Sequence, residues 1–159
     1  MNKGMNNGMP EPESTRGELA AIWIKRFKRG PMDPVDHASL VTARGIVGNA
    51  NQGGRRQVTI IEEEVWRMLI GQLSSDLPPS SRRANLMVRG VELKNSRGRV
   101  LTVGAVQIRI FNETKPCERM DEALPGLKDL MYGDWRGGAF GEVVNDGEIH
   151  IGDKVEWVD

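Results

Sequence analysis

The chain has 159 residues, and its 22 basic and 22 acidic side chains give a formal charge of zero. This length fits one domain around one core, and the balanced charge argues against a nucleic-acid binder that works through bulk charge. A lone cysteine, at position 117, excludes an internal disulfide and is usual in reducing compartments. The sequence shows no apolar run that resembles a signal peptide or a membrane span, so we expect a cytoplasmic protein.

The first segment differs in composition from the rest. It reads MNKGMNNGMPEPESTRG and is rich in Asn, Gly, Pro and Glu, with little to bury. We therefore expect 1–17 to be a disordered N-terminal tail and 18–159 to form one domain.

The first half of the domain carries strand patterns separated by loop signals. β-Branched and aromatic side chains predict a strand over 18–27, and the glycine and prolines of 29–39 predict a loop. A short strand is expected at 40–43. A loop rich in Gly and Asn follows (GIVGNANQGGRR, 45–56), and then a strand at 57–61.

The best helix candidate spans 62–73. Its apolar stripe falls at i, i+3, i+4 and i+8, and comprises Val65, Met68, Leu69 and Leu73. Three glutamates open the segment, where the helix dipole favours negative charge.

Short strands account for most of the remaining chain. They are expected at 86–91, 100–103, 106–111, 139–144, 148–151 and 154–158. Val106, Ile108 and Ile110 alternate with less apolar residues, which is the period of a strand with one buried face. Leucines between 117 and 132 predict a short helix interrupted by Pro-Gly, and Asn-Asp-Gly at 145–147 signals a hairpin turn.

This succession of short strands predicts a mainly β, β-barrel-like fold with one or two inserted helices. Closure into a barrel removes exposed strand edges, which is why it is the natural packing for such a pattern.

Several common catalytic signatures are absent from the sequence. It has no phosphate-binding loop ending in Lys and Ser or Thr, no HExxH, no CxxC and no GxSxG. His37 and His150 are far apart in sequence, and together with one cysteine they do not predict a zinc site.

Cys117 lies in NETKPCERM (112–120), after a strand and a proline. Two interpretations remain open from the residues alone. Free cysteine is often a small buried hydrophobe. Alternatively, Lys115 and Arg119 favour a reactive thiolate through their positive charge, whereas Glu118 opposes it.

Two further segments combine arginine with glycine or asparagine. They contribute Arg82, Arg83, Asn85 and Arg89 from SSRRANLMVRG, and Arg136, Gly137 and Gly138 from DWRGG. Arginine binds phosphate bidentately, and glycine allows a backbone to approach an anion closely. Taken singly, each of these arginines fits a structural or surface role better than an anion site. The Gly pair at 53–54 could cradle an anion or simply turn the chain.

Seven short motifs in order resemble the MOSC domain, named after the C-terminal part of molybdenum cofactor sulfurases. They are GIVGN (45–49), RQVTII (56–61), RxNLxVRG (83–90), GxxLxVG (98–104), TKPCERM (114–120), DWRGG (134–138) and GEIxIGDxV (147–155). The resemblance covers about residues 18–158 and describes a stand-alone, bacterial-type, single-domain member.

The resemblance implies a β-barrel-like MOSC fold with a cleft around a distinctive cysteine. It assigns the catalytic role to Cys117, which would also be the metal ligand if the molybdenum cofactor (molybdopterin) binds. The implied cofactor-binding residues are Arg83, Asn85, Arg89, Thr114, Arg136, Gly137 and Gly138. Pro116 would help to shape the pocket.

The sequence departs from the family pattern in the first loop. Asn49 stands where the family usually has Asp, and Asn51 and Gln52 stand where a His usually follows. The sequence also shows no counterpart of the N-terminal β-barrel domain that supplies part of the pocket in larger relatives.

Two classes of function follow. In the first, Cys117 binds the molybdenum cofactor or carries sulfur. An enzymatic activity would be sulfur transfer or molybdenum-dependent reduction of N-hydroxylated compounds, independent of pyridoxal phosphate. The partner would be a sulfur donor or an electron-transfer protein.

In the second class, the domain is a non-catalytic small β-barrel module for an anionic metabolite, a nucleotide or a partner protein. Cys117 would then be dispensable. Neither class requires nucleic acid or a membrane as a partner.

Overall fold

The structure, a computed structural model, describes residues 17–159. Apart from Gly17, the expected disordered tail over 1–17 lies outside the described residues. The strands are β2 Glu18–Lys25, β3 Met32–Val35, β4 His37–Val41, β5 Gly45–Ile46, β6 Val58–Glu62, β7 Leu86–Arg89, β8 Val100–Val103, β9 Val106–Glu113, β10 Ala139–Val143, β11 Gly147–His150 and β12 Val155–Trp157. The helical elements are α1 Glu63–Gln72, the 3-10 turn η2 Pro79–Arg82, α2 Glu118–Ala123 and α3 Leu127–Met131.

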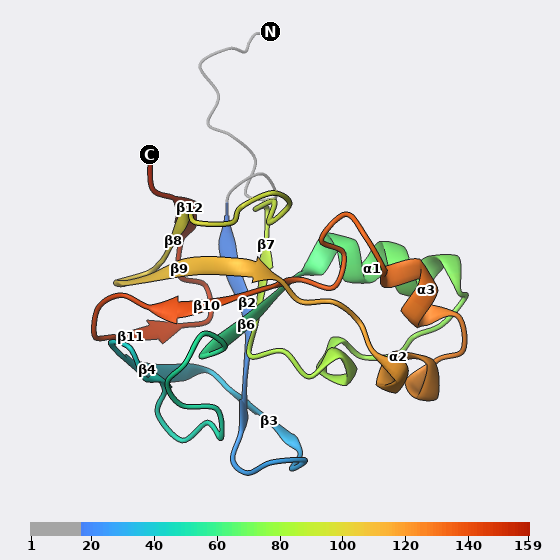
Figure 1. The fold of residues 1–159 in the computed structure, drawn as a ribbon, viewed down its shortest axis with the longest axis horizontal. Coiled ribbons are helices and arrows are strands. Elements are labelled where there is room, and N and C mark those ends of the chain that lie inside the picture. The colour runs from blue at the N-terminus through green and yellow to red at the C-terminus, as the bar shows by residue number, and fades with distance from the viewer. Residues whose placement is uncertain (1–16) are drawn as a thin grey trace, which may run out of the picture.

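The strands form two sheets, and the larger one curls into a half barrel (Figure 1). Its order is β12-β8-β9-β10-β6-β7-β2-β3, and the smaller sheet has the order β11-β4-β5. β6 and β7 pair in parallel, and the other pairings between strands within residues 17–159 are antiparallel. The mainly β, barrel-like fold is confirmed.

The core lies between the two sheets. Strand β9 contributes Val106, Ile108 and Ile110, which are fully buried as their alternation predicts. Leu40 of β4 and Ile149 of β11 reach the same cluster from the smaller sheet. Burial of such side chains stabilises the fold by about 1.5–3 kcal/mol each.

The helices form a separate layer beside the sheets, on the right of Figure 1. Their own apolar cluster contains Trp66 and Leu69 of α1, Met120 of α2 and Leu127 of α3. Met68, which the predicted stripe placed in the core, is 38% exposed. Trp66 is buried in the helical cluster instead of Met68. Its indole also donates a hydrogen bond to the main-chain oxygen of Leu77 at 3.1 Å.

The predicted loop over 29–39 is wrong in part, because it contains β3 and the start of β4. β3 pairs antiparallel with β2, and Pro34 lies opposite Trp23. A proline is tolerated in this strand because β3 is the edge of the larger sheet, where one side of the backbone needs no partner.

The predicted hairpin at 145–147 is also wrong. β10 pairs with β6 and β9, whereas β11 pairs with β4 in the other sheet. The loop side chains bind other segments: Asn145 Oδ1 accepts from the Gln107 amide, and Asp146 Oδ1 accepts from the Thr42 amide, both at 2.7 Å. The turn residues therefore connect two sheets instead of closing one ribbon.

The predicted short helix is interrupted at Pro125 and Gly126, as expected, and forms two helices. α2 ends at Ala123, and α3 begins at Leu127 after a left-handed Gly126. Within the described part of the chain, no helix has the length and apolar character needed to cross a membrane.

Candidate functional site

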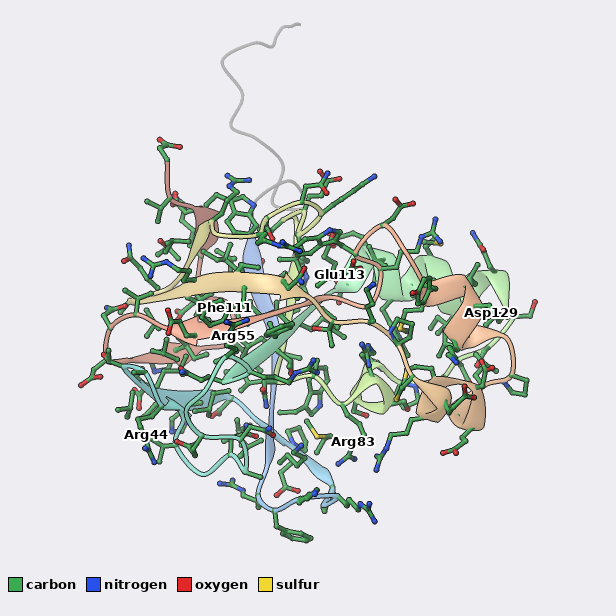
Figure 2. All side chains as sticks on the ribbon, viewed as in Figure 1. Arg44, Arg55, Arg83, Phe111, Glu113 and Asp129 are labelled. Carbon is green, nitrogen blue, oxygen red and sulfur yellow. The ribbon has the colours of Figure 1, made fainter. Side chains whose placement is uncertain are left out.

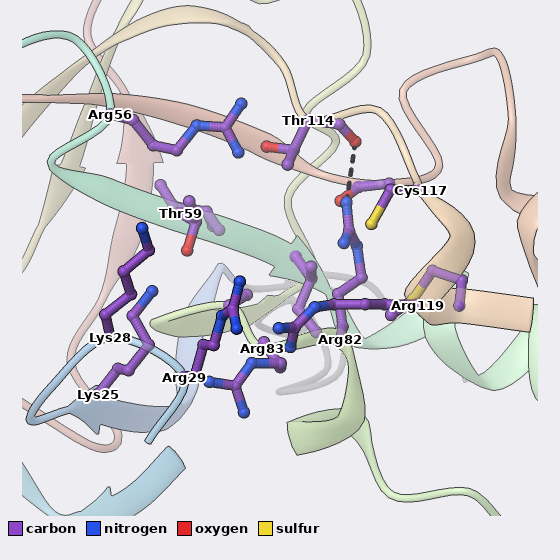
Figure 3. Close-up of a pocket in the computed structure, with 15 residues that line it drawn as sticks. Lys25, Lys28, Arg29, Arg56, Thr59, Arg82, Arg83, Thr114, Cys117 and Arg119 are labelled. Carbon is purple, nitrogen blue, oxygen red and sulfur yellow. Dashed lines mark hydrogen bonds between the residues drawn. The ribbon is translucent and has the colours of Figure 1, made fainter. Parts of the chain in front are cut away.

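A basic cleft opens where the larger sheet meets the helical layer. It has a volume of about 380 Å³ and is lined by the end of β2, by β6, by η2 and by the segment around α2 (Figure 3). Its cationic side chains are Lys25, Lys28, Arg29, Arg56, Arg82, Arg83 and Arg119. None of the described residues that line it is acidic.

These seven cations have no carboxylate partner within residues 17–159, although ion pairs occur elsewhere on the molecule. The zero net charge of the chain thus conceals a strongly uneven distribution. Clustered cations in a cleft focus a positive potential and attract anions.

The cations are close enough to disturb one another. The pKa of Lys25 lies below its ordinary value, first because the ammonium is partly desolvated and then because Arg83 and Arg119 repel its charge. The pKa of Arg83 is lowered by desolvation and by Arg119. A bound anion would relieve this repulsion.

Arg82 is a largely buried cation of the cleft, and it binds main-chain oxygens. Its Nε donates to the Gly137 oxygen and its Nη2 to the Thr114 oxygen, both at 3.1 Å (Figure 3). Burial lowers the pKa of its guanidinium to about 10. The nearby Cys117 raises this pKa, and the charge of Arg56 lowers it. Arg82 is thus held rigidly beside the cysteine.

Cys117 is exposed at the edge of this cleft. It stands between the end of β9 and the first residue of α2. This position contradicts the interpretation of Cys117 as a small buried hydrophobe and leaves its sulfur accessible to a ligand.

Thr114 supplies an unused polar group. The residue is 7% exposed, and its Oγ1 is buried without a hydrogen-bond partner within the described chain. Since buried polar atoms in proteins are nearly always paired, the hydroxyl is available to something bound in the cleft that Thr114 lines.

Of the residues implied by the resemblance, Cys117, Arg83, Thr114 and Gly137 come together in the cleft. Gly137 has a steric role there, because a Cβ on it would lie 2.0 Å from the Thr114 oxygen. Gly138 does not line the cleft, and it is required for another reason. Its φ is +99°, and any Cβ added to it would lie 2.2 Å from the Ile60 oxygen.

Asn85 is buried beneath the cleft, and its side chain is fully engaged with the protein. Its Nδ2 donates to the Trp23 oxygen at 3.2 Å and to Asn49 Oδ1 at 3.1 Å. Its Oδ1 accepts from the Thr59 amide at 3.1 Å. Asn85 therefore braces the floor instead of presenting a free group to a ligand.

Arg89 and Arg136 lie outside the cleft. Arg89 forms ion pairs with Glu63 at 3.0 Å and with Glu18 at 3.5 Å. Arg136 donates to the Leu130 oxygen at 3.0 Å. Both arginines therefore stabilise the fold, because their guanidinium groups bind partners at the surface of the protein itself.

Asn49, the departure in the first loop, also has a structural role. It is buried, and its Oδ1 accepts from the Lys25 amide at 2.9 Å as well as from Asn85. The amide oxygen joins the end of β2 to the loop that follows β5 and thereby fixes the backbone of Lys25.

Sequence reasoning did not place Lys25, Lys28, Arg29 and Arg56 in the site. The first three belong to the run KRFKRG (25–30) and the fourth to GGRR (53–56). These basic runs beside turns are the only signal available in the sequence, and they resemble ordinary surface charge.

The two histidines are remote from Cys117 in the fold. His37 of β4 and His150 of β11 stack with ring centroids 6.0 Å apart. Residues 17–159 contain no group of three His, Cys, Asp or Glu side chains arranged to hold a metal ion.

Comparison with known proteins supports both the fold and the motif assignment. Residues 45–156 match the family model of the MOSC domain. The fold is similar to the crystal structure of the YuaD protein from Bacillus subtilis, with a TM-score of 0.73 at 17% identity over 87% of this chain and 94% of that one.

Two YiiM structures are also similar. The protein from Geobacillus stearothermophilus gives a TM-score of 0.72 at 14% identity over 90% of this chain and 75% of that one. The protein from Escherichia coli gives 0.67 at 17% identity over 89% and 70%. A search of curated proteins finds no matching relative.

Proposed function

This chain belongs to the MOSC domain family, and from that premise we propose that it binds the molybdenum cofactor, or accepts sulfur, in the basic cleft through Cys117. The observation that carries the proposal is the meeting of the chain's one thiol with seven cations that have no acidic partner among the described residues.

The residues present suit a phosphorylated, metal-bearing pterin. A thiolate is a soft ligand of the kind that transition metals with sulfur coordination prefer, and Cys117 is exposed to the cleft. Guanidinium and ammonium groups bind phosphate through charge-assisted hydrogen bonds. The unpaired hydroxyl of Thr114 offers a further hydrogen bond inside the cleft.

Each part of the cleft has a separate task under this proposal. Cys117 would be the metal ligand, Arg83 and its cationic neighbours would hold the phosphate, and Arg82 would fix the segment that carries the cysteine. When bound, the cofactor would supply redox chemistry at its metal. Electrons would then come from a partner protein, since the sequence carries no flavin or haem motif.

The exposure of Cys117 equally suits sulfur carriage. Its thiolate would attack the outer sulfur of a persulfide on a donor protein. The donor's S–S bond breaks, the donor leaves as a thiolate, and Cys117 keeps the outer sulfur as a persulfide. The electrons and atoms balance without an added oxidant.

The partners and the location stay predictions. We expect a sulfur donor or an electron-transfer protein as partner and a cytoplasmic location. Sulfur transfer and reduction of N-hydroxylated compounds are the reactions proposed. A module that only binds an anionic metabolite would use the same cations and would not need Cys117.

The experiment that tests the proposal is anaerobic loading with cofactor released from a donor molybdoenzyme, followed by gel filtration and measurement of the oxidised pterin. Wild type should retain pterin, and Cys117→Ser and Arg83→Gln should retain much less. Arg55→Gln is the matched control, because Arg55 lies over Phe111, 5.8 Å from its ring, and does not line the cleft (Figure 2).

Loading with a persulfide donor and mass spectrometry test the other arm. A gain of one sulfur atom on the wild type and none on Cys117→Ser supports sulfur carriage. Pterin retention that is equal in wild type and Cys117→Ser, with no sulfur gained, contradicts both arms and favours the plain binding module.

A further inference from the structure

The loop between β2 and β3, residues 26–31, exposes an aromatic ring among cations. Phe27 is 61% exposed, more than any other large apolar side chain within residues 17–159. Its neighbours Arg26, Lys28 and Arg29 are exposed as well. A single exposed apolar side chain is ordinary, so what Phe27 can do depends on how the loop holds it and on what surrounds it.

The ring of Phe27 is held in place by a tight turn. The Gly30 amide donates to the Phe27 oxygen at 2.9 Å, with Lys28 and Arg29 between them. Arg29 has a φ of +65°, a left-handed conformation that costs a residue with a side chain free energy. A Cβ on Gly30 would lie 2.9 Å from the Phe27 ring. The ring therefore rests against bare backbone, and the rest of it faces solvent.

The turn is tied to the cleft that contains the thiol. Arg83, which lines the cleft, donates from Nη2 to the Gly30 oxygen at 2.6 Å. Lys28 and Arg29 line the same cleft, and they lie on the side opposite Arg119 (Figure 3). A molecule held on the turn would therefore lie beside the opening that leads to Cys117.

The cations of the turn are free to pair with an acidic partner. Arg26 forms an ion pair with Asp33 at 3.4 Å. Lys28 and Arg29 have no ion pair with a carboxylate of residues 17–159. Docking onto the Phe27 ring would take these two charges partly out of water, which is favourable only if the partner supplies carboxylates.

An acidic protein segment fits this surface better than a lipid bilayer or a single-stranded nucleic acid. Stable attachment to a bilayer takes two strong anchoring signals, and the loop offers one ring and a short group of cations. Single-stranded nucleic acid is held by several aromatic side chains on which successive bases stack. A protein segment needs only one apolar anchor with complementary charge around it.

We propose that this turn is a docking site for an acidic segment of a partner protein, with Phe27 as the apolar anchor and Lys28 and Arg29 as the cations that pair with the segment's carboxylates. The inference deepens the proposed function and rests on it for the role of the partner, which would be the expected sulfur donor or electron-transfer protein. The fixed turn lowers the ordering cost of docking, because its backbone and ring are already in place.

The probe is a synthetic peptide of about ten residues in which glutamates flank two leucines, and heteronuclear NMR titration at low salt measures its binding. Wild type should bind it in the millimolar range or more tightly, with shift changes at 26–31. Phe27→Ser should weaken binding by about tenfold, because the leucines lose the ring that covers them. Joint replacement by Lys28→Gln and Arg29→Gln should weaken it by a similar factor.

Two companion peptides and one control variant separate docking on the turn from general attraction to the cleft. When serines replace the leucines, Phe27→Ser should change the affinity by less than about twofold, because both changes remove the same contact. When glutamines replace the glutamates, wild type should bind at least about tenfold more weakly. Val158→Ser should bind every peptide as wild type does, since Val158 is 41% exposed beside β12, at the edge of the larger sheet opposite β3 (Figure 1).

Equal binding of the leucine peptide by wild type and Phe27→Ser would overturn the proposal, as would an equal loss in Val158→Ser or no binding up to about the millimolar range. Phosphatidylserine vesicles and single-stranded oligouridylate test the other occupants. If either binds wild type more tightly than the peptide does and loses that binding in Phe27→Ser, the turn serves a lipid surface or an RNA, and the proposal of a protein partner is wrong.

Phe27→Ser and Cys117→Ser distinguish this inference from the proposed function. Phe27 does not line the cleft, so Phe27→Ser should retain pterin as wild type does, and Cys117→Ser should bind the leucine peptide as wild type does. A chain that retains neither pterin nor sulfur but binds the peptide through Phe27 would contradict the proposed function alone. A chain that retains pterin through Cys117 but binds the peptide equally well without Phe27 would contradict the docking inference alone.

Discussion

Arg82 and Thr114 are joined by a hydrogen bond from Nη2 to the main-chain oxygen, 3.1 Å long, across 32 positions of sequence. The same guanidinium donates from Nε to Gly137. One buried cation thus ties η2 and the DWRGG loop to the segment that leads from β9 to Cys117. The position of the cysteine depends on this tie.

Arg82→Met should destabilise the protein by about 2–4 kcal/mol, because two buried main-chain oxygens lose a charged donor. Urea unfolding measures the change. Arg44→Met is the control, since Arg44 is exposed and lies away from the cleft (Figure 2). A cost below about 0.5 kcal/mol would contradict the structural role of Arg82.

The charge around Cys117 should show in its alkylation. We expect the ratio of the rate constants for iodoacetate and iodoacetamide to exceed that of glutathione by about tenfold at low salt, because the cleft concentrates the anionic reagent. The ratio should fall towards that of glutathione in 1 M salt, where the screening length is about 3 Å. The chain has one cysteine, so the label reports this site alone; a ratio independent of salt would refute the electrostatic account.

Arg83 and Arg89 should separate binding from stability. Arg89→Gln loses ion pairs with Glu63 and Glu18, so it should lower the free energy of unfolding by about 1 kcal/mol and leave pterin retention unchanged. Arg83→Gln should weaken pterin retention and leave the free energy of unfolding nearly unchanged. Pterin loading and urea unfolding of both variants check this, and weaker retention by Arg89→Gln would show that Arg89 contributes to the site.

Glu62 should make stability depend on pH. Burial, as the largest cause, raises the pKa of its carboxyl to about 7 from 4.5, although the Leu93 amide acts in the opposite direction. The folded state therefore binds more protons than the unfolded state between these values, and its stability falls as the pH rises from about 4.5 to about 7. The loss is complete above that window.

Glu62→Gln keeps an oxygen for the Leu93 amide and removes the charge. Since the carboxyl is partly in contact with water, the variant should gain about 1–3 kcal/mol at pH 8 and nothing at pH 4. Urea unfolding of both proteins at the two pH values isolates Glu62, because other titrating groups cancel in the difference. A gain of equal size at pH 4 and pH 8 would show that ionisation is not the cause.

Local sequence patterns predicted the strands and helices whose formation depends on residues close to one another in the sequence. The alternation of β9 is visible over 106–111, and it matches full burial of its apolar face. The glutamate-led helix was also predictable, since α1 spans Glu63–Gln72. By contrast, β3 was missed because a proline in a strand is acceptable only at a sheet edge, and edge position is a property of the whole sheet.

The membership of the site was harder to predict for a geometric reason. Motif neighbours need not share a cleft: Arg83 lines it, whereas Arg89 lies at the far end of β7, about 10 Å from the first residue of that four-residue strand. Conversely, Lys25, Arg56 and Arg83 come from three distant segments. Only the sheet order brings β2, β6 and β7 side by side.

The most direct measurement is the molybdenum and pterin content of protein purified from a cofactor-competent host and from a host unable to make the cofactor, for wild type and Cys117→Ser. The account predicts about one molybdenum and one pterin per wild-type chain from the competent host only, and a large loss in Cys117→Ser. Cofactor held equally by wild type and Cys117→Ser would contradict the role of the thiol. Absence of cofactor from both, together with no persulfide on Cys117, would contradict the central claim.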